Sequence, residues 1–197
     1  MKRVAFGFFI LFSFTLHALP CYGLPAEDVR LVTDSHYFET ARQLIRDSRE
    51  SVRVMMFEMS YYEGRSPAPT NQLIQELIEA KKRNVRVEVI LETREGEDRT
   101  TKRNRKAGKV LSEGGVEVIF DPLVKTTHAK LLIVDQSLIL VGSTNWTYPA
   151  LTDNHEVAVL IRSKELAKEL IEYFNLVKST GTPLSSKKNA PKPRTSH

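Results

Sequence analysis

The sequence contains a single cysteine, Cys21, among its 197 residues. One thiol cannot form an internal disulfide framework, and it cannot supply the paired thiolates on which many structural zinc sites depend. A long apolar segment is lacking too, since the run at 4–16 is shorter than the roughly 20 residues of a membrane-spanning helix. With 41% hydrophobic and 27% charged residues, the composition is that of an average globular protein. It excludes wholesale disorder and a disulfide-stabilised scaffold.

The N-terminal segment has the pattern of a secretory signal. Lys2 and Arg3 precede the apolar run, and small residues follow it near Gly23. This order predicts a signal peptide over 1–23, cleaved after Gly23, and a secreted or periplasmic protein. The alternative is that the segment is retained as an anchor, in which case the protein would be held at a membrane.

The positive charge, a formal net +5, is concentrated in two places. Residues 179–197 are basic, rich in Ser, Thr and Pro, and without apolar periodicity, which predicts a disordered tail after a globular domain at 24–178. The second place is a run without acidic residues at 99–109. A phosphate backbone is a suitable partner for its cations, which are Arg99, Lys102, Arg103, Arg105, Lys106 and Lys109. The alternative interpretation is a solvated helix face.

The hydrophobic spacing between these ends alternates between helical and strand periods. It predicts helices at 36–50 and 100–113, and between them a helix whose apolar residues lie at 73–78 and which ends at the cations 81–83. It predicts strands at 52–59, 85–91 and 116–120. Two successive strand–helix–strand units indicate an α/β fold with a largely parallel sheet covered by helices. The residues 61–70 form a loop that borders the expected site. Glu58, on the strand leading there, has no assigned role.

The segment 127–147, THAKLLIVDQSLILVGSTNWT, predicts a β-hairpin. Its apolar strands are 131–134 and 138–141. Between them lies Asp135, a residue type favoured at the first position of a tight turn.

Polar side chains gather at the open end of this hairpin. If 136 and 137 are the two central turn residues, Lys130 faces Ser143 and His128 faces Asn145. The period of two then places all four side chains on one face and turns Asp135 away from them.

This group of side chains suits phosphoryl transfer. An imidazole with a pKa near neutrality attacks phosphorus or delivers a proton, and an ammonium and an amide hold the non-bridging oxygens. The Ser143 hydroxyl adds a donor, and Gly142 permits close backbone approach. The alternative is a hairpin whose polar end simply meets solvent.

The spacing His128-x-Lys130-x4-Asp135-x6-Gly142-Ser143-x-Asn145 resembles the HxKx4Dx6GSxN signature of the phospholipase D superfamily at all six fixed positions. Over most of residues 30–178 the chain is similar to the single-motif nuclease branch of that superfamily. The resemblance implies a three-layer α/β/α sandwich with a mixed, largely parallel sheet.

The resemblance also implies the site. His128 is then the nucleophile that forms a phosphohistidine intermediate, and neither a metal nor another cofactor is needed. Asp135 belongs to the catalytic set, and Lys130, Ser143 and Asn145 also bind the substrate. Glu156 matches the carboxylate that orients the histidine, with Asp153 as a weaker competitor.

One motif implies a homodimer. His36 and His155 lack a lysine two residues later, so neither begins a second copy. A double displacement needs a nucleophile on one side of phosphorus and an acid on the other, and a twofold dimer supplies both.

Three functions remain open. The first is a secreted or periplasmic, metal-independent endonuclease that cleaves DNA, with RNA as a second candidate, and whose partner is nucleic acid bound partly by Arg99, Lys102, Arg103 and Arg105. The second is a membrane-anchored phospholipid hydrolase of the cardiolipin-hydrolysing type. The third is an idle binding module, which the intact motif disfavours.

Overall fold

The computed structural model describes residues 23–64, 68–96, 98–121 and 125–184. The predicted signal segment up to residue 22 and residues 185–197 of the predicted tail lie outside the described residues. The elements are β1 (Asp28–Thr33), α1 (His36–Asp47), β2 (Ser51–Met56), α2 (Pro69–Lys82), β3 (Arg86–Leu91), α3 (Arg99–Glu113), β4 (Glu117–Phe120), β5 (Lys130–Val134), β6 (Leu138–Gly142), α4 (Tyr148–Thr152), β7 (Val157–Arg162), α5 (Lys164–Thr180) and β8 (Thr182–Pro183). Within the ranges given above, no helix is long and apolar enough to cross a membrane.

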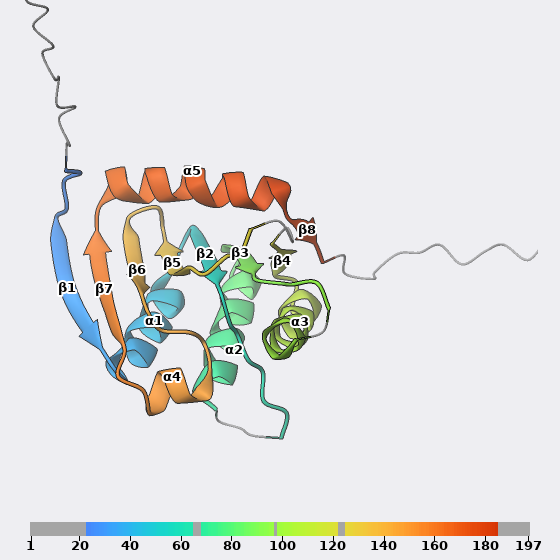
Figure 1. The fold of residues 1–197 in the computed structure, drawn as a ribbon. Helices are drawn as coiled ribbons and strands as arrows, with labels where there is room; N and C mark the ends of the chain where they lie inside the picture. The colour runs from blue at the N-terminus through green and yellow to red at the C-terminus, as the bar shows by residue number, and fades with distance from the viewer. Residues whose placement is uncertain (1–22, 65–67, 97, 122–124, 185–197) are drawn as a thin grey trace, which may run out of the picture.

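One eight-stranded sheet lies between two helical layers (Figure 1). Helices α1, α2 and α3 cover one face, where Ile45, Leu77 and Leu111 join the larger core cluster. Helix α5 lies across the other face and packs there through Ala167 and Phe174. The predicted three-layer α/β/α sandwich is therefore confirmed.

The strand order is β1-β7-β6-β5-β2-β3-β4-β8. Only the pairs β2–β3 and β3–β4 are parallel, and the other five pairs are antiparallel. The sheet is mixed as predicted, but the expectation that it is largely parallel is wrong. The two strand–helix–strand units give the parallel part, whereas the hairpin β5–β6 and the edge strands β1 and β8 add antiparallel pairs.

The turn of the β5–β6 hairpin differs from its prediction by one residue. Leu131 pairs with Val141 and Val134 with Leu138, so the loop has three residues instead of two. Asp135 and Gln136 adopt φ values of 47° and 56°, in the left-handed region that non-glycine residues seldom occupy. This register would place Lys130 opposite Gly142, so the predicted pairing of Lys130 with Ser143 is wrong.

The boundary predicted between the domain and the tail, at residue 179, lies several residues too early in the chain. Helix α5 continues to Thr180, and β8 pairs with β4 through Thr182 and Pro183. Residues 179–184 are therefore part of the folded domain, because the short β8 closes the edge of the sheet.

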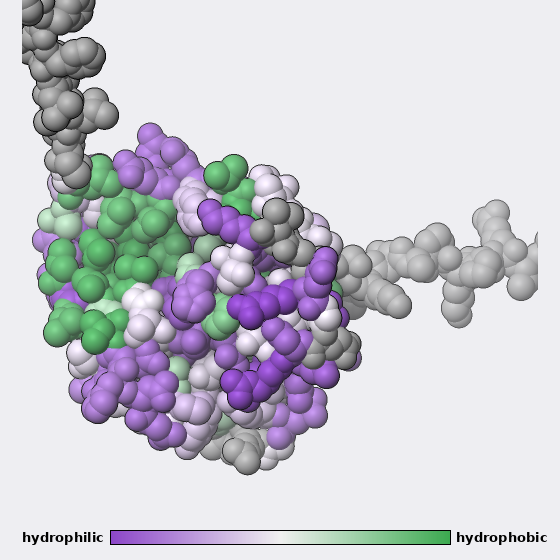
Figure 2. All heavy atoms as spheres, viewed as in Figure 1, coloured by the Kyte–Doolittle hydropathy of each residue, from purple (hydrophilic) through white to green (hydrophobic). Residues whose placement is uncertain are grey.

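Hydrophobic side chains lie exposed over β1, β7 and β6 (Figure 2). Leu31 pairs with Val159, which pairs with Val141, so these side chains share the face on which α5 packs. Helix α5 leaves this end of the face open (Figure 1). We call the exposed residues Val29, Leu31, Val141 and Val157 the apolar surface.

Candidate active site

His128 and Lys130 lie together where β5 begins. The ammonium of Lys130 donates to the carbonyl oxygen of His128 at 2.8 Å and lies 3.3 and 3.4 Å from the two ring nitrogens. Lys130 is only 6% exposed, whereas His128 is exposed. The predicted proximity of the two side chains is confirmed, and it presents an imidazole to solvent beside a partly desolvated cation.

Burial lowers the pKa of the Lys130 ammonium, and the negative charge of Glu156 acts in the opposite direction. The carboxylate is therefore close enough to interact with the cation, although the two residues lie on β5 and just before β7. The cation is held in a site where its charge is less screened than in water.

The segment 143–146 carries the second half of the motif past the start of β5. Gly142 still pairs with Ala158 of β7, but Trp146 bridges to Met59, beyond the end of β2. Because β5 lies between β6 and β2 in the sheet, the chain crosses the end of β5 within these few residues. The crossing brings residues 143–146 to the sheet end that carries His128.

Gly142 is required at the point where this crossing begins. A Cβ atom there would collide with the carbonyl oxygen of Val157 and the Cα atom of Ala158. The approach of β6 to β7 therefore excludes any side chain, which gives a packing reason for the glycine of the motif.

Ser143 and Glu156 form a hydrogen-bonded pair. The Ser143 hydroxyl donates to Oε2 of Glu156 and accepts from the backbone N–H of Val157 at 3.1 Å. Asn154 donates to Oε1 of Glu156 at 3.1 Å, and the N–H of Glu156 donates to Asp34. Glu156 thus lies in the site as predicted, whereas the competitor Asp153 is exposed at the end of α4. The predicted catalytic role of Glu156 stays a prediction.

Asn145 has an unused acceptor. Its side-chain oxygen is buried and has no hydrogen-bond partner among the described residues. A buried amide oxygen without a partner is costly, so a water molecule or a substrate group is expected to bond to it.

Phe57 and Arg94 belong to the site but were not predicted from the sequence. The Phe57 ring lies 4.6 Å from the His128 ring between centroids. The Lys130 ammonium and the Arg94 guanidinium lie 4.9 and 5.4 Å from the Phe57 centroid, within the range of cation–π attraction. Phe57 thus supports the imidazole and two cations, and it follows β2 directly, where the period of an apolar strand gave no sign of a role.

Glu92 fixes the chain just before the histidine. Its carboxylate accepts the backbone N–H of Thr127 at 2.6 Å and the Nε–H of Arg94 at 3.3 Å. Glu92 is buried, and burial raises its pKa, with the charge of Asp121 acting in the same direction. Its position directly after β3 was the available signal, because polar residues at the ends of parallel strands often lie in sites.

Helix α3 carries the predicted cationic run and is tied to the same sheet end. Asn104 bonds to the backbone of Met59, Phe57 and Glu92. Arg103 forms an ion pair with Glu58, which gives Glu58 the role that its sequence context did not. Of the other predicted substrate-binding cations, Arg99, Lys102 and Arg105 are exposed on α3.

Asp135 lies away from the site, contrary to its predicted inclusion among the catalytic residues. It follows the last residue of β5, at the opposite end of that strand from Lys130. Its carboxylate accepts the backbone N–H groups of Arg49, Glu50 and Ser51 at 2.8 to 3.0 Å. The motif carboxylate is therefore a structural residue that joins the hairpin turn to the start of β2.

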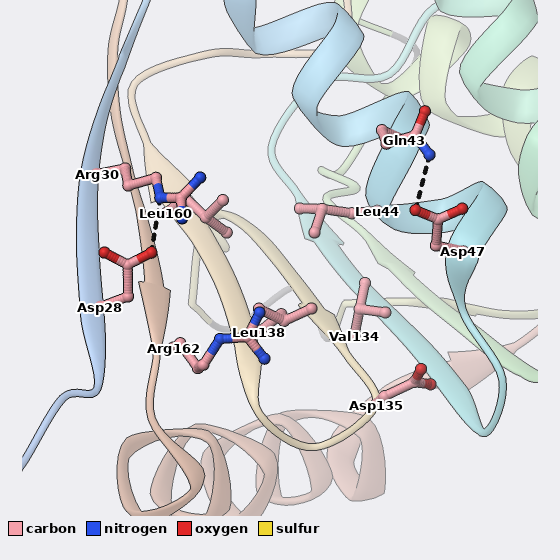
Figure 3. A pocket seen from close by; sticks show the side chains of 10 residues that line it. All are labelled: Asp28, Arg30, Gln43, Leu44, Asp47, Val134, Asp135, Leu138, Leu160 and Arg162. Atoms are coloured by element: carbon pink, nitrogen blue, oxygen red, sulfur yellow. Dashed lines mark hydrogen bonds and ion pairs between the residues drawn. The ribbon is translucent and has the colours of Figure 1, made fainter.

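Asp135 also lines a hollow of about 220 Å³ between α1 and strands β1, β6 and β7 (Figure 3). Its charged side chains include Arg30, which is paired with Asp28, while Asp47 is bonded to Gln43. The hollow contains neither His128 nor Lys130.

The part of the chain that the structure describes contains no group of three or more His, Cys, Asp or Glu side chains placed to hold a metal ion.

Comparison with known proteins finds relatives with different activities. The polyphosphate kinase of Vibrio cholerae is 25% identical over 169 residues, which are 82% of this chain and 23% of the kinase. The mitochondrial cardiolipin hydrolase of Canis lupus familiaris is 29% identical over 68 residues, 34% of this chain and 27% of the hydrolase. The chain thus spans about a quarter of the length of these two relatives.

Among solved structures, Nuc of Salmonella typhimurium, a phospholipase D family member, aligns with a TM-score of 0.69 and 24% identity. The alignment covers 81% of this chain and 99% of Nuc, so the two proteins share one fold along nearly the whole length of Nuc. The family model described as "Cardiolipin synthase, PLD-like domain" matches residues 41–177, which include every residue of the motif. This chain is therefore a member of the PLD-like domain family, within the phospholipase D superfamily.

Proposed function

We propose that the protein is a phosphodiesterase that cleaves nucleic acid through a covalent histidine intermediate. The observation that carries this proposal is the exposed imidazole of His128 held beside the buried ammonium of Lys130. The Ser143–Glu156 pair and the unpartnered oxygen of Asn145 lie at the same end of the sheet.

In the first step, a ring nitrogen of His128 forms a bond to phosphorus and the bond from phosphorus to one ester oxygen breaks. An acid protonates the departing oxygen. Lys130 and the side-chain amide of Asn145 hold the non-bridging oxygens as charge builds on them, while the Ser143 hydroxyl keeps its hydrogen bond to Glu156. In the second step, a base removes a proton from water, the water oxygen binds phosphorus, and the phosphorus–nitrogen bond breaks.

A second copy of the chain supplies the acid and the base. Each chain contributes one His128, so a twofold dimer brings a second imidazole to the phosphorus. The apolar surface supports this arrangement, because Val141 and Val157 flank Ser143 and Glu156 in the sheet. Its most exposed members, Val29 and Leu31, are 60% and 71% exposed, and burying them against a second copy would favour association.

The charge around the site favours nucleic acid. Arg94 contacts Phe57 beside His128, and α3 presents Arg99, Lys102 and Arg105 to solvent. Asn104 anchors this helix to the segment that carries Phe57. Cations spread from the site along a helix can contact several phosphates, whereas a phospholipid presents only its headgroup.

Removal of the signal segment after Gly23 would place this activity outside the cytoplasm. A mass measurement of the N-terminus of the secreted protein tests this cleavage.

The test is a parallel assay of the purified protein on single-stranded DNA, duplex DNA, RNA and cardiolipin vesicles. Nucleic acid should be cleaved, and His128→Ala should abolish the cleavage while His36→Ala, an exposed histidine at the start of α1, leaves it unchanged. Activity that persists in a folded His128→Ala protein contradicts the mechanism.

A tethered dimer tests the shared site. One wild-type and one His128→Ala subunit should together lose nearly all turnover and accumulate a covalent phosphate adduct on the intact histidine. Retention of half the wild-type rate would show that each subunit works alone.

Hydrolysis of a phospholipid is the second candidate function. The similarity to a mitochondrial cardiolipin hydrolase favours it, and the apolar surface would then face lipid instead of a second copy. Turnover of cardiolipin vesicles without turnover of nucleic acid in the same assay would establish it.

A further inference from the structure

Two tyrosines form an aromatic pair beside the motif. Tyr148 begins α4 and is 41% exposed, and Tyr62 lies in the segment after β2. Their ring centroids are 6.4 Å apart in an edge-to-face arrangement of 85°. The hydroxyl of Tyr62 accepts the backbone N–H of Tyr148 at 3.2 Å. The two rings are thus held in a defined orientation at the surface.

The pair is continuous with the candidate active site. The N–H of Trp146 donates to the carbonyl of Glu58 at 3.0 Å, and the N–H of Ser60 donates to the carbonyl of Trp146 at 2.9 Å. Tyr148 is three residues beyond Asn145, so their Cα atoms are at most roughly 11 Å apart. Tyr148 is therefore within reach of a nucleotide next to a phosphate that is bound at Asn145.

The segment that carries Tyr62 is bonded to α2. The N–H of Tyr62 donates to the side-chain oxygen of Asn71 at 3.0 Å, and the Asn71 amide donates to the carbonyl of Tyr62 at 2.8 Å. These two bonds fix Tyr62 against the first turn of α2. In an edge-to-face pair, the contact between the rings covers a face of only one of them, and Tyr148 is 41% exposed. A planar ligand can therefore stack on the pair without separating the two rings.

Cations of α3 flank the same segment. Lys106 forms an ion pair with Glu63, next to Tyr62, at 3.2 Å, and Arg103 is paired with Glu58. An aromatic face beside cations binds a base and its phosphate together, which is how proteins hold single-stranded nucleic acid. In a duplex the faces of internal bases are covered by their neighbours, and an acyl chain has no aromatic face to offer.

We propose that Tyr148, supported by Tyr62, stacks on an unpaired base next to the scissile phosphate, and that the preferred substrate is single-stranded nucleic acid. This inference rests on the proposed nuclease function. It assigns a stacking subsite to residues outside the motif.

The experiment compares Tyr148→Leu and Tyr148→Phe with wild type on a single-stranded oligonucleotide, a duplex of the same sequence and bis(4-nitrophenyl) phosphate. Tyr148→Leu removes the ring on which the base stacks, and this should raise KM for the single strand roughly 5- to 100-fold. Tyr148→Phe keeps the ring and should stay within about twofold of wild type, because stacking needs no hydroxyl. The kcat for the small diester should be unchanged in both variants, which shows that the catalytic groups are intact; its KM is not the control, because its nitrophenyl rings are themselves planar groups that stack.

Tyr173→Leu is the matched control, since Tyr173 is 48% exposed on α5, on the opposite face of the sheet. This variant should cleave all three substrates with the kinetic constants of wild type. Equal KM values for the single strand in Tyr148→Leu and wild type would overturn the subsite, and so would an equal loss on single strand and duplex. Absence of nucleic-acid cleavage by the wild type, with the small diester still hydrolysed, would instead refute the nuclease function.

Discussion

The hydroxyl of Ser143 donates a hydrogen bond to the carboxylate of Glu156, joining the second half of the motif to a residue 13 positions later. The negative charge of the same carboxylate acts to raise the pKa of Lys130, against the lowering by burial. Glu156 therefore holds the serine by a hydrogen bond and acts on the lysine through its charge, and the lysine lies beside His128. A single carboxylate thus acts on one residue from each half of the motif.

Glu156→Gln should lower kcat by about 10- to 100-fold, because hydrogen bonds to a charged group contribute about 1.5–3 kcal/mol and the variant has no charge. Glutamine keeps an oxygen that accepts the Ser143 hydroxyl, so the fold should persist while the charge is lost. Steady-state kinetics on an oligonucleotide, with circular dichroism as a check on folding, gives the answer. An unchanged kcat would show that Glu156 has only a structural role.

The activity should be lost at alkaline pH, and at a lower pH than the ordinary pKa of a lysine would predict. The protonated ammonium is the form that holds phosphate oxygens, so activity is present below the pKa of Lys130 and is lost as pH rises through it. Burial lowers this pKa, which places the decline of kcat/KM below the ordinary value of 10.5.

Glu156→Gln removes the charge that raises the Lys130 pKa, so the decline should move to still lower pH in that variant. Asp153→Asn is the control, because this exposed carboxylate lies just after α4, and the variant should leave the profile unchanged. A pH–rate profile with the same alkaline decline in Glu156→Gln and wild type would contradict the interaction.

Asp135→Ala should destabilise the protein by about 1–3 kcal/mol, because three backbone N–H groups lose their acceptor. Asp135→Asn keeps one acceptor oxygen and tolerates positive φ, so its loss should be smaller. Urea unfolding measures both variants. The kcat of the folded Asp135→Ala fraction should equal that of wild type, and a lower value would return Asp135 to the catalytic set.

Excess EDTA should leave turnover essentially unchanged, because the proposed nucleophile is an imidazole and the proposed counter-charge is an ammonium. The measurement is the initial rate on single-stranded DNA before and after prolonged chelation. A rate that disappears and returns on addition of magnesium or zinc would rule out the histidine route.

Periodicity and the motif predicted much of this molecule. The helix at 100–113 and the strands 85–91 and 116–120 lie within a residue of α3, β3 and β4, because their apolar spacing is regular. His128 and Lys130 were correctly predicted to lie together, because side chains two residues apart in an extended chain point to the same face.

The hairpin turn and the crossing segment could not be predicted, because they depend on contacts between distant segments that the spacing of residues does not reveal. The turn follows from Asp135 binding the distant backbone of residues 49–51, and two residues at positive φ are not what local propensity favours. Asn145 reaches the site because Trp146 bridges to Met59, a pairing between segments far apart in the chain. Phe57 and Arg94 were missed because their role lies in what they touch, not in their spacing.

The edge positions of β1 and β8 bear on how this protein is best attached to a surface or a tag. Seven strand-to-strand spacings separate them, which is roughly 34 Å across the sheet. A bulky group joined just before β1 would lie next to Val29 and Leu31 and would compete with a second copy for them. A group joined after β8 would lie at the far edge, so immobilisation from that side leaves the association of two copies unobstructed.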